Sequence, residues 1–411
     1  MPSLFTLRFF ITRYRYHILA LLFFTLTEIW FHSRSYNVRR PSEPLDPAFA
    51  LGCRNPPDAL FAHDPHSPPH SALLPRENAT VLMLARNDEV DEAVNAIKSF
   101  ESQFNRWYNY PVVFLNDKPW SREFKEKVGK EVSGKAIFST IPTEMWNWPK
   151  DKEGNELIDQ KKYAKLMKEM AKHDLPYVEN VNYHHMCRFY SGFFYDHPAL
   201  QPYKYYWRLE PSITYTCAIP YDPFRSLRLT NKTYGYTLAL WEIGRTAPSL
   251  FRTTHNHKSA HSIPTTSLWT SLLDASWAPL PLRWSLMSNP SLFHSRTPGG
   301  DAWNMCHMWS NFEIADLDFF RSEQYRRFFR ELDATGNFYY ERWGDAAVHS
   351  LAAGLFLEPW QVHWFEDIGY AHPPFQHCPK EGVGCNCRCL EGVGVVDGFC
   401  TRRLREGVDP Y

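Results

Sequence analysis

Two short, continuous apolar runs with a helical segment between them constrain the fold of this chain most strongly. Val81–Ala85 and Pro111–Leu115 have the length and apolarity of strands that are buried on both faces of a sheet. Between them, the apolar residues from Val90 to Ile97 recur at the i, i+3, i+4, i+7 spacing of an amphipathic helix. The pattern predicts a βαβ unit with a right-handed crossover, and therefore an α/β fold.

Charged residues stand where these strands are expected to end. Arg86 follows the first run and Asp117 follows the second. Ligands of open α/β sheets bind at the carboxyl ends of the strands, and a guanidinium group can hold two phosphate oxygens at once. We therefore expect Arg86 and Asp117 at a ligand site, with solvated loop charges as the alternative.

A third strand is predicted at Tyr203–Leu209. Pro211 cannot donate a hydrogen bond to a sheet, so the strand must stop before it. Glu210 is thereby left at the carboxyl end of the strand. Its alternative role is a salt bridge.

An aromatic stretch, Cys306–Ile314, carries a single carboxylate, Glu313. Carboxylates are rarely buried unless they are paired, so Glu313 between two apolar residues is expected either to be paired or to take part in chemistry. The segment Tyr325–Leu332 has helical spacing, and Gly336 is placed to end that helix.

The long run Cys306–Leu357, together with Asp367–Pro374 and Asn78–Leu250, resembles the fungal α-1,2-mannosyltransferases of glycosyltransferase family 15. The resemblance leaves out the first seventy-odd residues and Arg252–Gly300. It implies a single GT-A-like α/β catalytic domain with a mixed central sheet. It also implies transfer of mannose from GDP-mannose to mannosylated glycoprotein acceptors, with retention of the α configuration.

The resemblance also implies a metal site. Most GT-A transferases use an Asp-x-Asp motif to bind a divalent cation, whereas Asp316-x-Asp318 in this chain lies at an expected helix start. The family instead uses the Glu of an Arg-x-Glu-Pro motif and a downstream His, which match Glu210 and His372. A carboxylate and an imidazole suit Mn²⁺ better than Mg²⁺.

Three further roles follow from the resemblance. Tyr183, just before a predicted helix, matches an active-site tyrosine. Glu313 is the candidate nucleophile, or, if the acceptor attacks from the front face, a group that stabilises positive charge on the sugar. Arg86 would hold the nucleotide, with Asp117 beside it.

Some residues depart from the family pattern. Tyr190 stands where Asn is usual, and Ser212 where an acid or glycine is usual. Residues 253–300 form an atypical loop, either specific to this chain or an annotation error such as a retained intron. Its histidines, His255, His257 and His261, are more often merely polar than metal-binding in such a loop. These departures motivate an alternative function as an inactive, mannan-binding or assembly subunit.

The N-terminal region is predicted to be a membrane anchor and a stem. Arginines precede the apolar run Ile18–Thr27, so residues 1–32 are interpreted as a cytosolic tail and uncleaved signal anchor, with a cleaved signal peptide as the alternative. The proline-rich residues 33–76 are interpreted as a stem, and 77–411 as the lumenal catalytic domain. The expected location is the Golgi membrane, in single-pass type II topology.

Cysteines and acceptor motifs agree with a lumenal location. Five of the nine cysteines fall in 378–400, which we expect to form a disulfide-linked clasp similar to that of the family. An odd number leaves at least one cysteine free or intermolecular. Asn78 and Asn231 begin N-glycosylation motifs. The formal net charge of zero argues against a nucleic-acid partner.

Overall fold

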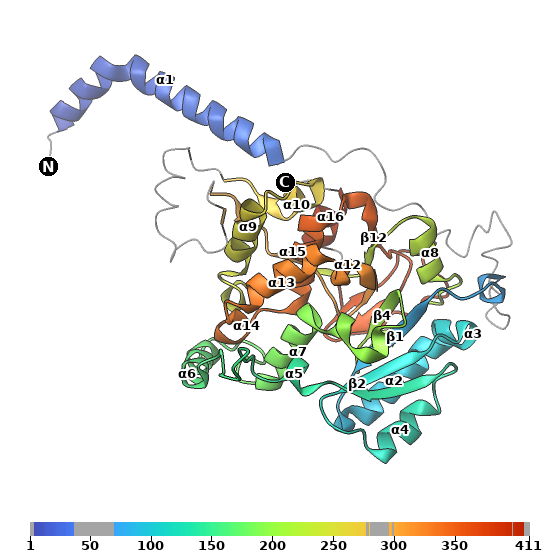
Figure 1. Ribbon diagram of the computed structural model, residues 1–411. Coiled ribbons are helices and arrows are strands. Elements are labelled where there is room, and N and C mark those ends of the chain that lie inside the picture. Colours follow the sequence, from blue (N-terminus) through green and yellow to red (C-terminus); the bar gives the residue numbers. More distant parts are fainter. Residues whose placement is uncertain are drawn as a thin grey trace.

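The computed structural model describes residues 4–36, 70–276, 279, 296–297, 300–396 and 398–406. Its centre is a mixed sheet that contains seven strands within this described part, in the order β12-β6-β11-β4-β1-β2-β3 (Figure 1). The strands are β1 (Ala79–Leu84), β2 (Val112–Asn116), β3 (Ala136–Thr140), β4 (Tyr205–Leu209), β6 (Tyr234–Tyr236), β11 (Glu313–Asp316) and β12 (Val362–Trp364).

The predicted βαβ unit is confirmed. β1 pairs in parallel with both β2 and β4, and the helix α2 (Val90–Phe100) connects β1 to β2. β11 runs antiparallel to β4, with Glu313 directly opposite Arg208. The amino end of β11 therefore lies at the same edge of the sheet as the carboxyl end of β4.

Helices cover both faces of the sheet and give it two cores. One core holds Val81 and Met83 of β1 with side chains of α2, α4 and α8, and the other holds Leu82 with side chains of α7, α13 and α15. The helices are α4 (Arg122–Gly129), α6 (Gln160–Ala171), α7 (Val181–Gly192), α8 (Pro223–Leu229), α12 (Leu317–Arg321), α13 (Glu323–Asp333), α14 (Asn337–Tyr340), α15 (Asp345–Phe356) and α16 (Phe399–Glu406).

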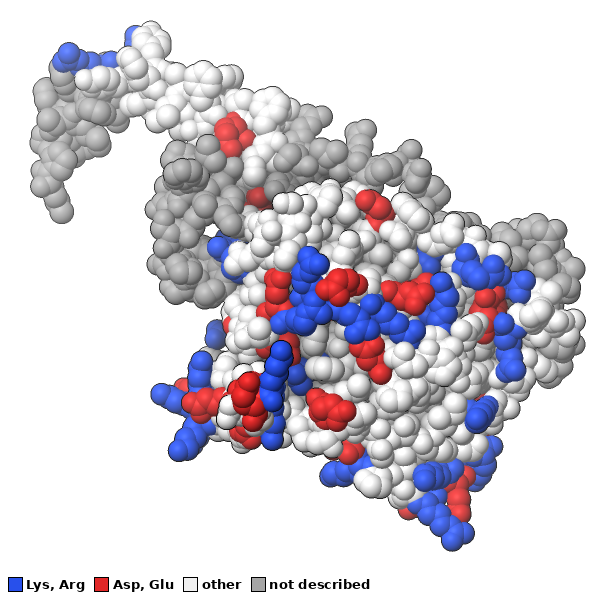
Figure 2. All heavy atoms as spheres, in the orientation of Figure 1, with Lys and Arg blue, Asp and Glu red and all other residues white. Residues whose placement is uncertain are grey.

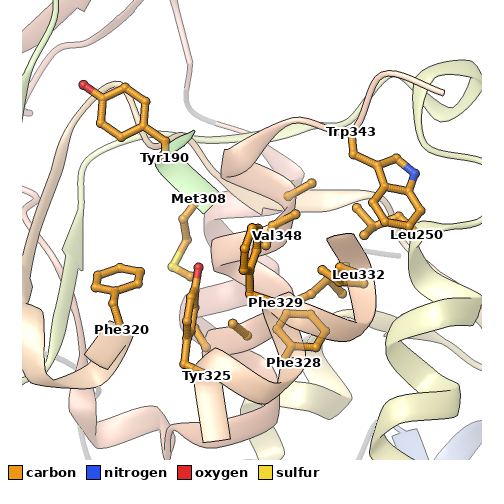
Figure 3. Close-up of a cluster of buried hydrophobic side chains, with 14 of the residues drawn as sticks. Tyr190, Leu250, Met308, Phe320, Tyr325, Phe328, Phe329, Leu332, Trp343 and Val348 are labelled. Atoms are coloured by element: carbon orange, nitrogen blue, oxygen red, sulfur yellow. The ribbon is translucent and has the colours of Figure 1, made fainter. Parts of the chain in front are cut away.

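The helix α13 shows how the sequence pattern sets this packing. Its first turn is capped by the Ser322 hydroxyl, and its predicted apolar face, from Tyr325 to Leu332, is buried against α7 and α15 (Figure 3). Gly336 lies just beyond its end with the positive φ of +71° that glycine adopts without cost. The outer surface over α12 and α13 carries interspersed acidic and basic side chains (Figure 2).

Smaller sheets and disulfides hold the C-terminal region against this core. The small strands are β5 (Thr214–Tyr215), β7 (Ala239–Trp241), β8 (Leu273–Asp274), β9 (Ala302–Trp303), β10 (Cys306–Met308), β13 (Tyr370–His372), β14 (Phe375–His377) and β15 (Gly394–Val395). Disulfides join Cys217 to Cys387, Cys306 to Cys400, and Cys378 to Cys389, and Cys385 is also in a disulfide. The prediction of a disulfide-linked clasp is confirmed, and Cys187 is free and buried.

Two local predictions were wrong. Tyr183 lies inside α7 rather than before a helix, because Asn180 caps that helix three residues earlier. The start of the region 253–300 is not a loop: it is helical in α9 (Leu250–Ala260) and α10 (Ser267–Ser271). Most of the remainder of that region lies outside the described residues.

The N-terminal segment forms the helix α1 (Leu4–Tyr36), with many exposed apolar side chains. Among the described residues, no helix has both the length and the apolarity needed to cross a membrane. Most of the predicted stem falls outside the described residues, whereas its last part, residues 70–76, is described and begins with a short 3-10 helix at His70–Leu73. Both predicted glycosylation acceptors, Asn78 and Asn231, have exposed side chains.

Candidate active site

Four of the six predicted site residues lie at one edge of the central sheet. Glu210 directly follows β4, Arg86 and Asp117 follow the parallel strands β1 and β2, and Glu313 begins the antiparallel strand β11. Strand direction alone brings these four residues to the same edge.

Arg208 is the centre of the site, and it was not singled out in the sequence. Its guanidinium group donates from Nε to Glu210 Oε1 at 2.6 Å and from Nη1 to Asp345 Oδ2 at 2.5 Å. Ser310 Oγ also donates to Asp345 Oδ2, at 2.7 Å. Arg208 is buried, so these contacts act in a medium of lower dielectric constant than water.

The two carboxylates on Arg208 have pKa values displaced in opposite directions. Burial raises the pKa of Glu210 and outweighs the lowering effect of Arg208. Burial also disfavours the charged form of Asp345, but Arg208 and His349 together hold the pKa of Asp345 below its usual range. Environments that displace neighbouring acids in this way are typical of functional sites.

The ring of Tyr190 lies against Arg208, whose Cζ is 3.5 Å from the ring centroid. A guanidinium group on an aromatic face gains a cation–π attraction, especially where water is excluded. Tyr190 therefore covers one face of Arg208 and leaves the contacts of Arg208 with Glu210 and Asp345 intact.

His372 lies at the end of β13 and forms an edge-to-face contact with Trp309, at 5.2 Å between ring centroids. Its Nδ1 is 3.3 Å from the Pro373 carbonyl oxygen, which favours the tautomer with the proton on Nδ1 and a lone pair on Nε2. Burial lowers the pKa of His372, and the positive charge of Arg208 lowers it further. His372 is thus a neutral imidazole, the form that binds metals.

These residues fit the metal that the family resemblance implies. Glu210 offers a carboxylate oxygen and His372 offers a neutral imidazole nitrogen, a mixed set that suits Mn²⁺. Arg208 holds one Glu210 oxygen and so orients the carboxylate. With only two protein ligands, the remaining coordination positions would be left for phosphate oxygens and water.

Tyr183 stacks on Tyr177, with 4.9 Å between ring centroids and 13° between ring planes. The guanidinium group of Arg342 lies on its ring, at 5.2 Å from the centroid. Burial raises the pKa of Tyr183, and the charges of Arg342, Asp345 and Glu242 act on it as well. Its hydroxyl group is therefore protonated, and it lies in the same charged neighbourhood as Arg208.

Glu313 is completely buried on the same sheet face as Arg208. Its Oε2 accepts a hydrogen bond from the Tyr234 hydroxyl and lies 2.8 Å from His349 Nδ1, while its buried Oε1 has no hydrogen-bond partner among the residues that the structure describes. His349 Nε2 is 2.9 Å from the Tyr190 carbonyl oxygen. Burial raises the pKa of Glu313, against the opposing effect of His349.

Arg86 is mostly exposed and is bound to its neighbour Glu89, at 2.9 Å between Nη2 and Oε1. Hydrogen bonding to Glu89, followed by its charge, raises the pKa of Arg86, and Asp117 is near enough to contribute. A phosphate group at this position would have to compete with Glu89 for the guanidinium group.

Sequence reasoning missed Arg208, Asp345 and Glu242. Arg208 was visible as the first residue of the Arg-x-Glu-Pro motif. Asp345 is 137 positions further along the chain and is brought to the site only by the start of α15. Glu242 carries no sequence signal, although its charge acts on Tyr183.

The comparisons with known proteins agree on one family. The family model described as glycolipid 2-α-mannosyltransferase matches residues 55–407. An O-glycoside α-1,2-mannosyltransferase homolog, number 4, of Schizosaccharomyces pombe is 42% identical over 375 residues, which cover 88% of this chain and 81% of that protein. The probable mannosyltransferase KTR3 of Saccharomyces cerevisiae is 40% identical, covering 80% of this chain and 76% of that protein.

Solved structures give the same picture. The mannosyltransferase Ktr4p from S. cerevisiae in complex with GDP superposes with a TM-score of 0.69 at 31% identity, covering 92% of this chain and 89% of that one. Core-mannan synthase A from Aspergillus fumigatus, in a Mn/GDP form, superposes with a TM-score of 0.67 at 34% identity, covering 90% and 89%.

Proposed function

The chain belongs to the family of glycolipid 2-α-mannosyltransferases, glycosyltransferase family 15, and we propose that it transfers mannose from GDP-mannose to the 2-hydroxyl of a mannoside. The chain is a glycosyltransferase of this family, and its mixed α/β fold is that of Ktr4p. The observation that carries the proposal is the Glu210–Arg208–Asp345 cluster at the edge of the central sheet, with His372 of the neighbouring small sheet near enough to feel the charge of Arg208.

We assign Glu210 and His372 to Mn²⁺, in keeping with the Mn/GDP form of core-mannan synthase A. When bound, the metal would supply Lewis-acid neutralisation of the departing diphosphate. Arg208 orients Glu210 through its Nε–Oε1 hydrogen bond and remains positively charged. The site then requires no Asp-x-Asp motif, because the imidazole replaces one of the two carboxylates.

Arg86 and Asp117 are assigned to the donor, and Tyr183 to the reacting region. Arg86 can turn from Glu89 to a diphosphate because its side chain is 58% exposed. The Tyr183 hydroxyl keeps its proton and contacts the buried Cys187 thiol, from which it would have to turn to donate a hydrogen bond to the leaving group. The exposed ring of Tyr177, stacked on Tyr183, gives a flat apolar surface of the kind on which a sugar can stack.

Glu313 is assigned to stabilisation of the positive charge that develops on the sugar. A nucleophile must reach the anomeric carbon, whereas the carboxyl group of Glu313 has no exposed surface and has one oxygen bound by Tyr234 and His349. A buried negative charge, by contrast, acts over several ångströms where the dielectric constant is low. Its burial therefore favours front-face attack by the acceptor over a glycosyl-enzyme intermediate.

The proposed setting is the Golgi lumen, with a glycoprotein glycan as acceptor. The exposed acceptor asparagines Asn78 and Asn231 and the disulfides support passage through an oxidising compartment. Residues 1–32 are proposed as a cytosolic tail and signal anchor, 33–76 as a stem, and 77–411 as a GT-A-like lumenal domain. Arginines at the start of α1 and its exposed apolar side chains support membrane attachment.

One assay tests the function directly. The purified protein is incubated with GDP-mannose, Mn²⁺ and α-methyl mannoside, and the linkage of the product is determined by NMR. We expect an α-1,2-linked dimannoside. If the folded protein binds GDP but forms no product, the enzyme proposal fails and a mannan-binding role takes its place.

A further inference from the structure

A second cluster of ligand-type side chains joins α9 to α13. His257 lies on α9, His261 lies immediately after it, and Glu331 lies on α13. His257 Nδ1 is 2.7 Å from Glu331 Oε2, and His261 Nε2 is 2.6 Å from Glu331 Oε1. The two imidazole rings are 4.5 Å apart between centroids.

The helix geometry explains why the two histidines meet. Residues four positions apart lie on the same face of a helix, and α9 directs this face at α13. The three potential ligand atoms all lie within 4.8 Å of one another. Metal–ligand bonds of about 2.0–2.2 Å place the ligand atoms of a tetrahedral zinc site roughly 3.3 Å apart, so small side-chain rotations suffice.

We infer that His257, His261 and Glu331 form a binding site for a divalent transition-metal ion such as Zn²⁺, with a coordination position left for water. The nitrogen and oxygen donors match the ligands that zinc takes in proteins. The site is separate from Glu210 and His372 and shares no residue with them. Both of its histidines lie in a part of the chain that the family resemblance did not cover.

Burial and access both suit such a site. The side chain of His257 is only 2% exposed, which fixes one ligand, whereas those of His261 and Glu331 are 30% and 41% exposed and open the site to solvent. The positive charge of Arg327 lies near His257 and weakens the attraction of the site for a cation.

The alternative to a metal site is a purely hydrogen-bonded bridge between the two helices. Glu331 can bridge the two histidines directly, with a proton on each facing imidazole nitrogen, and hold α9 to α13 without a metal. Metal binding would require the proton of each neutral imidazole to move from the nitrogen that faces Glu331 to the other ring nitrogen. The two possibilities therefore differ in whether zinc binds and stabilises the protein.

The test measures zinc bound to the full-length protein by equilibrium dialysis and elemental analysis, with Mn²⁺ and GDP present in excess to occupy the proposed catalytic site. The variants are His261→Gln and Glu331→Gln, which alter exposed ligands. The matched control is Glu323→Gln, an exposed carboxylate on the same helix that pairs with Arg330. GDP binding by each variant verifies that it is folded.

We expect wild type and Glu323→Gln to hold one zinc equivalent, which His261→Gln and Glu331→Gln bind at least ~10-fold more weakly. Zinc should also raise the melting temperature of wild type and the control alone, because a ligand stabilises only the state that binds it. Equal zinc binding by all four proteins would overturn the inference. So would a fall in the melting temperature of both ligand variants with no zinc effect in wild type, which is the result expected of the hydrogen-bonded bridge.

Discussion

Replacing Glu313 by Gln distinguishes a catalytic role of this buried carboxylate from a purely structural one. The substitution keeps the size of the side chain and its ability to accept a hydrogen bond from Tyr234, but removes its negative charge. The group that responds is His349, which shares a 2.8 Å contact with Glu313 and whose pKa is raised by that carboxylate despite burial.

The structure sets the size of the stability change. If His349 loses its proton, the glutamine side chain that replaces the carboxylate can still be hydrogen-bonded, and the cost is about 1–2 kcal/mol. If His349 stays charged, a buried cation is left unpaired at a cost of about 3–5 kcal/mol. Because deprotonation of His349 avoids the larger cost, we expect the smaller one, or a fall of roughly 2–6 °C in melting temperature.

The expected loss of activity is much larger. A group that stabilises transition-state charge contributes about 10²–10³ to kcat, and GDP affinity should be unchanged because no donor contact is assigned to Glu313. Turnover, GDP affinity and melting temperature are to be measured on one preparation. Glu101→Gln is the matched control, because Glu101 is a buried glutamate, hydrogen-bonded to Asn105 on the opposite face of the sheet.

The combination of results decides the role. Glu101→Gln should lower only the stability of the protein and leave the turnover per folded molecule unchanged. If Glu313→Gln behaves in the same way, Glu313 is a structural partner of His349 and its catalytic assignment is wrong. If GDP affinity falls in parallel with turnover, Glu313 shapes the donor site rather than the transition state.

Further predictions concern the metal, pH and the N-terminal region. Excess chelator should abolish mannose transfer and Mn²⁺ should restore it best, whereas full activity in chelator would contradict the assignment of Glu210 and His372. His372→Ala should lower turnover at least ~10-fold and raise the Mn²⁺ concentration needed, with melting temperature in chelator unchanged. Burial lowers the pKa of His185 from 6.5 to about 4, so the unfolded chain takes up the proton at a higher pH than the folded protein does. The free energy of unfolding should therefore fall by up to about 3 kcal/mol as the pH drops from 6.5 to 4. Urea titrations over this range should show a smaller fall for His185→Gln. A chain that begins at residue 33, without the predicted anchor, should retain full activity, and a misfolded product would contradict the separation of the anchor from the catalytic domain.

The sequence predicted the parts of the fold that depend on local pattern. The strands of the βαβ unit, the buried face of α13 and the position of Glu210 at a strand end all follow from periodicity or from proline. These features depend on residues within a few positions of one another, where side-chain direction is fixed by the type of element. The location of the site at one edge of the sheet could then be predicted as well, because parallel strands place their carboxyl ends together.

The missed parts depend on contacts between distant segments or on a hidden pattern. Asp345 reaches Arg208 only because α15 starts beneath the end of β4. The helix α9 escaped recognition because its buried positions include Thr254, His257 and Lys258, polar residues that erase the apolar period. A histidine in that stretch was therefore interpreted as part of a polar loop, although it faces another helix.

The two departures from the family pattern lie next to the site and leave its chemistry in place. Ser212 has a φ of +64°, a conformation that suits glycine and short acids better, so the usual residues there reflect backbone shape rather than metal binding. Tyr190 lies against Arg208 and gains a cation–π contact, without displacing Glu210 or Asp345 from the guanidinium group. A chain that had lost its catalytic function would have no need to keep Glu210 oriented at the strand end by Arg208, with Asp345 on the other side of the guanidinium group. The intact cluster therefore favours an active transferase over a binding subunit.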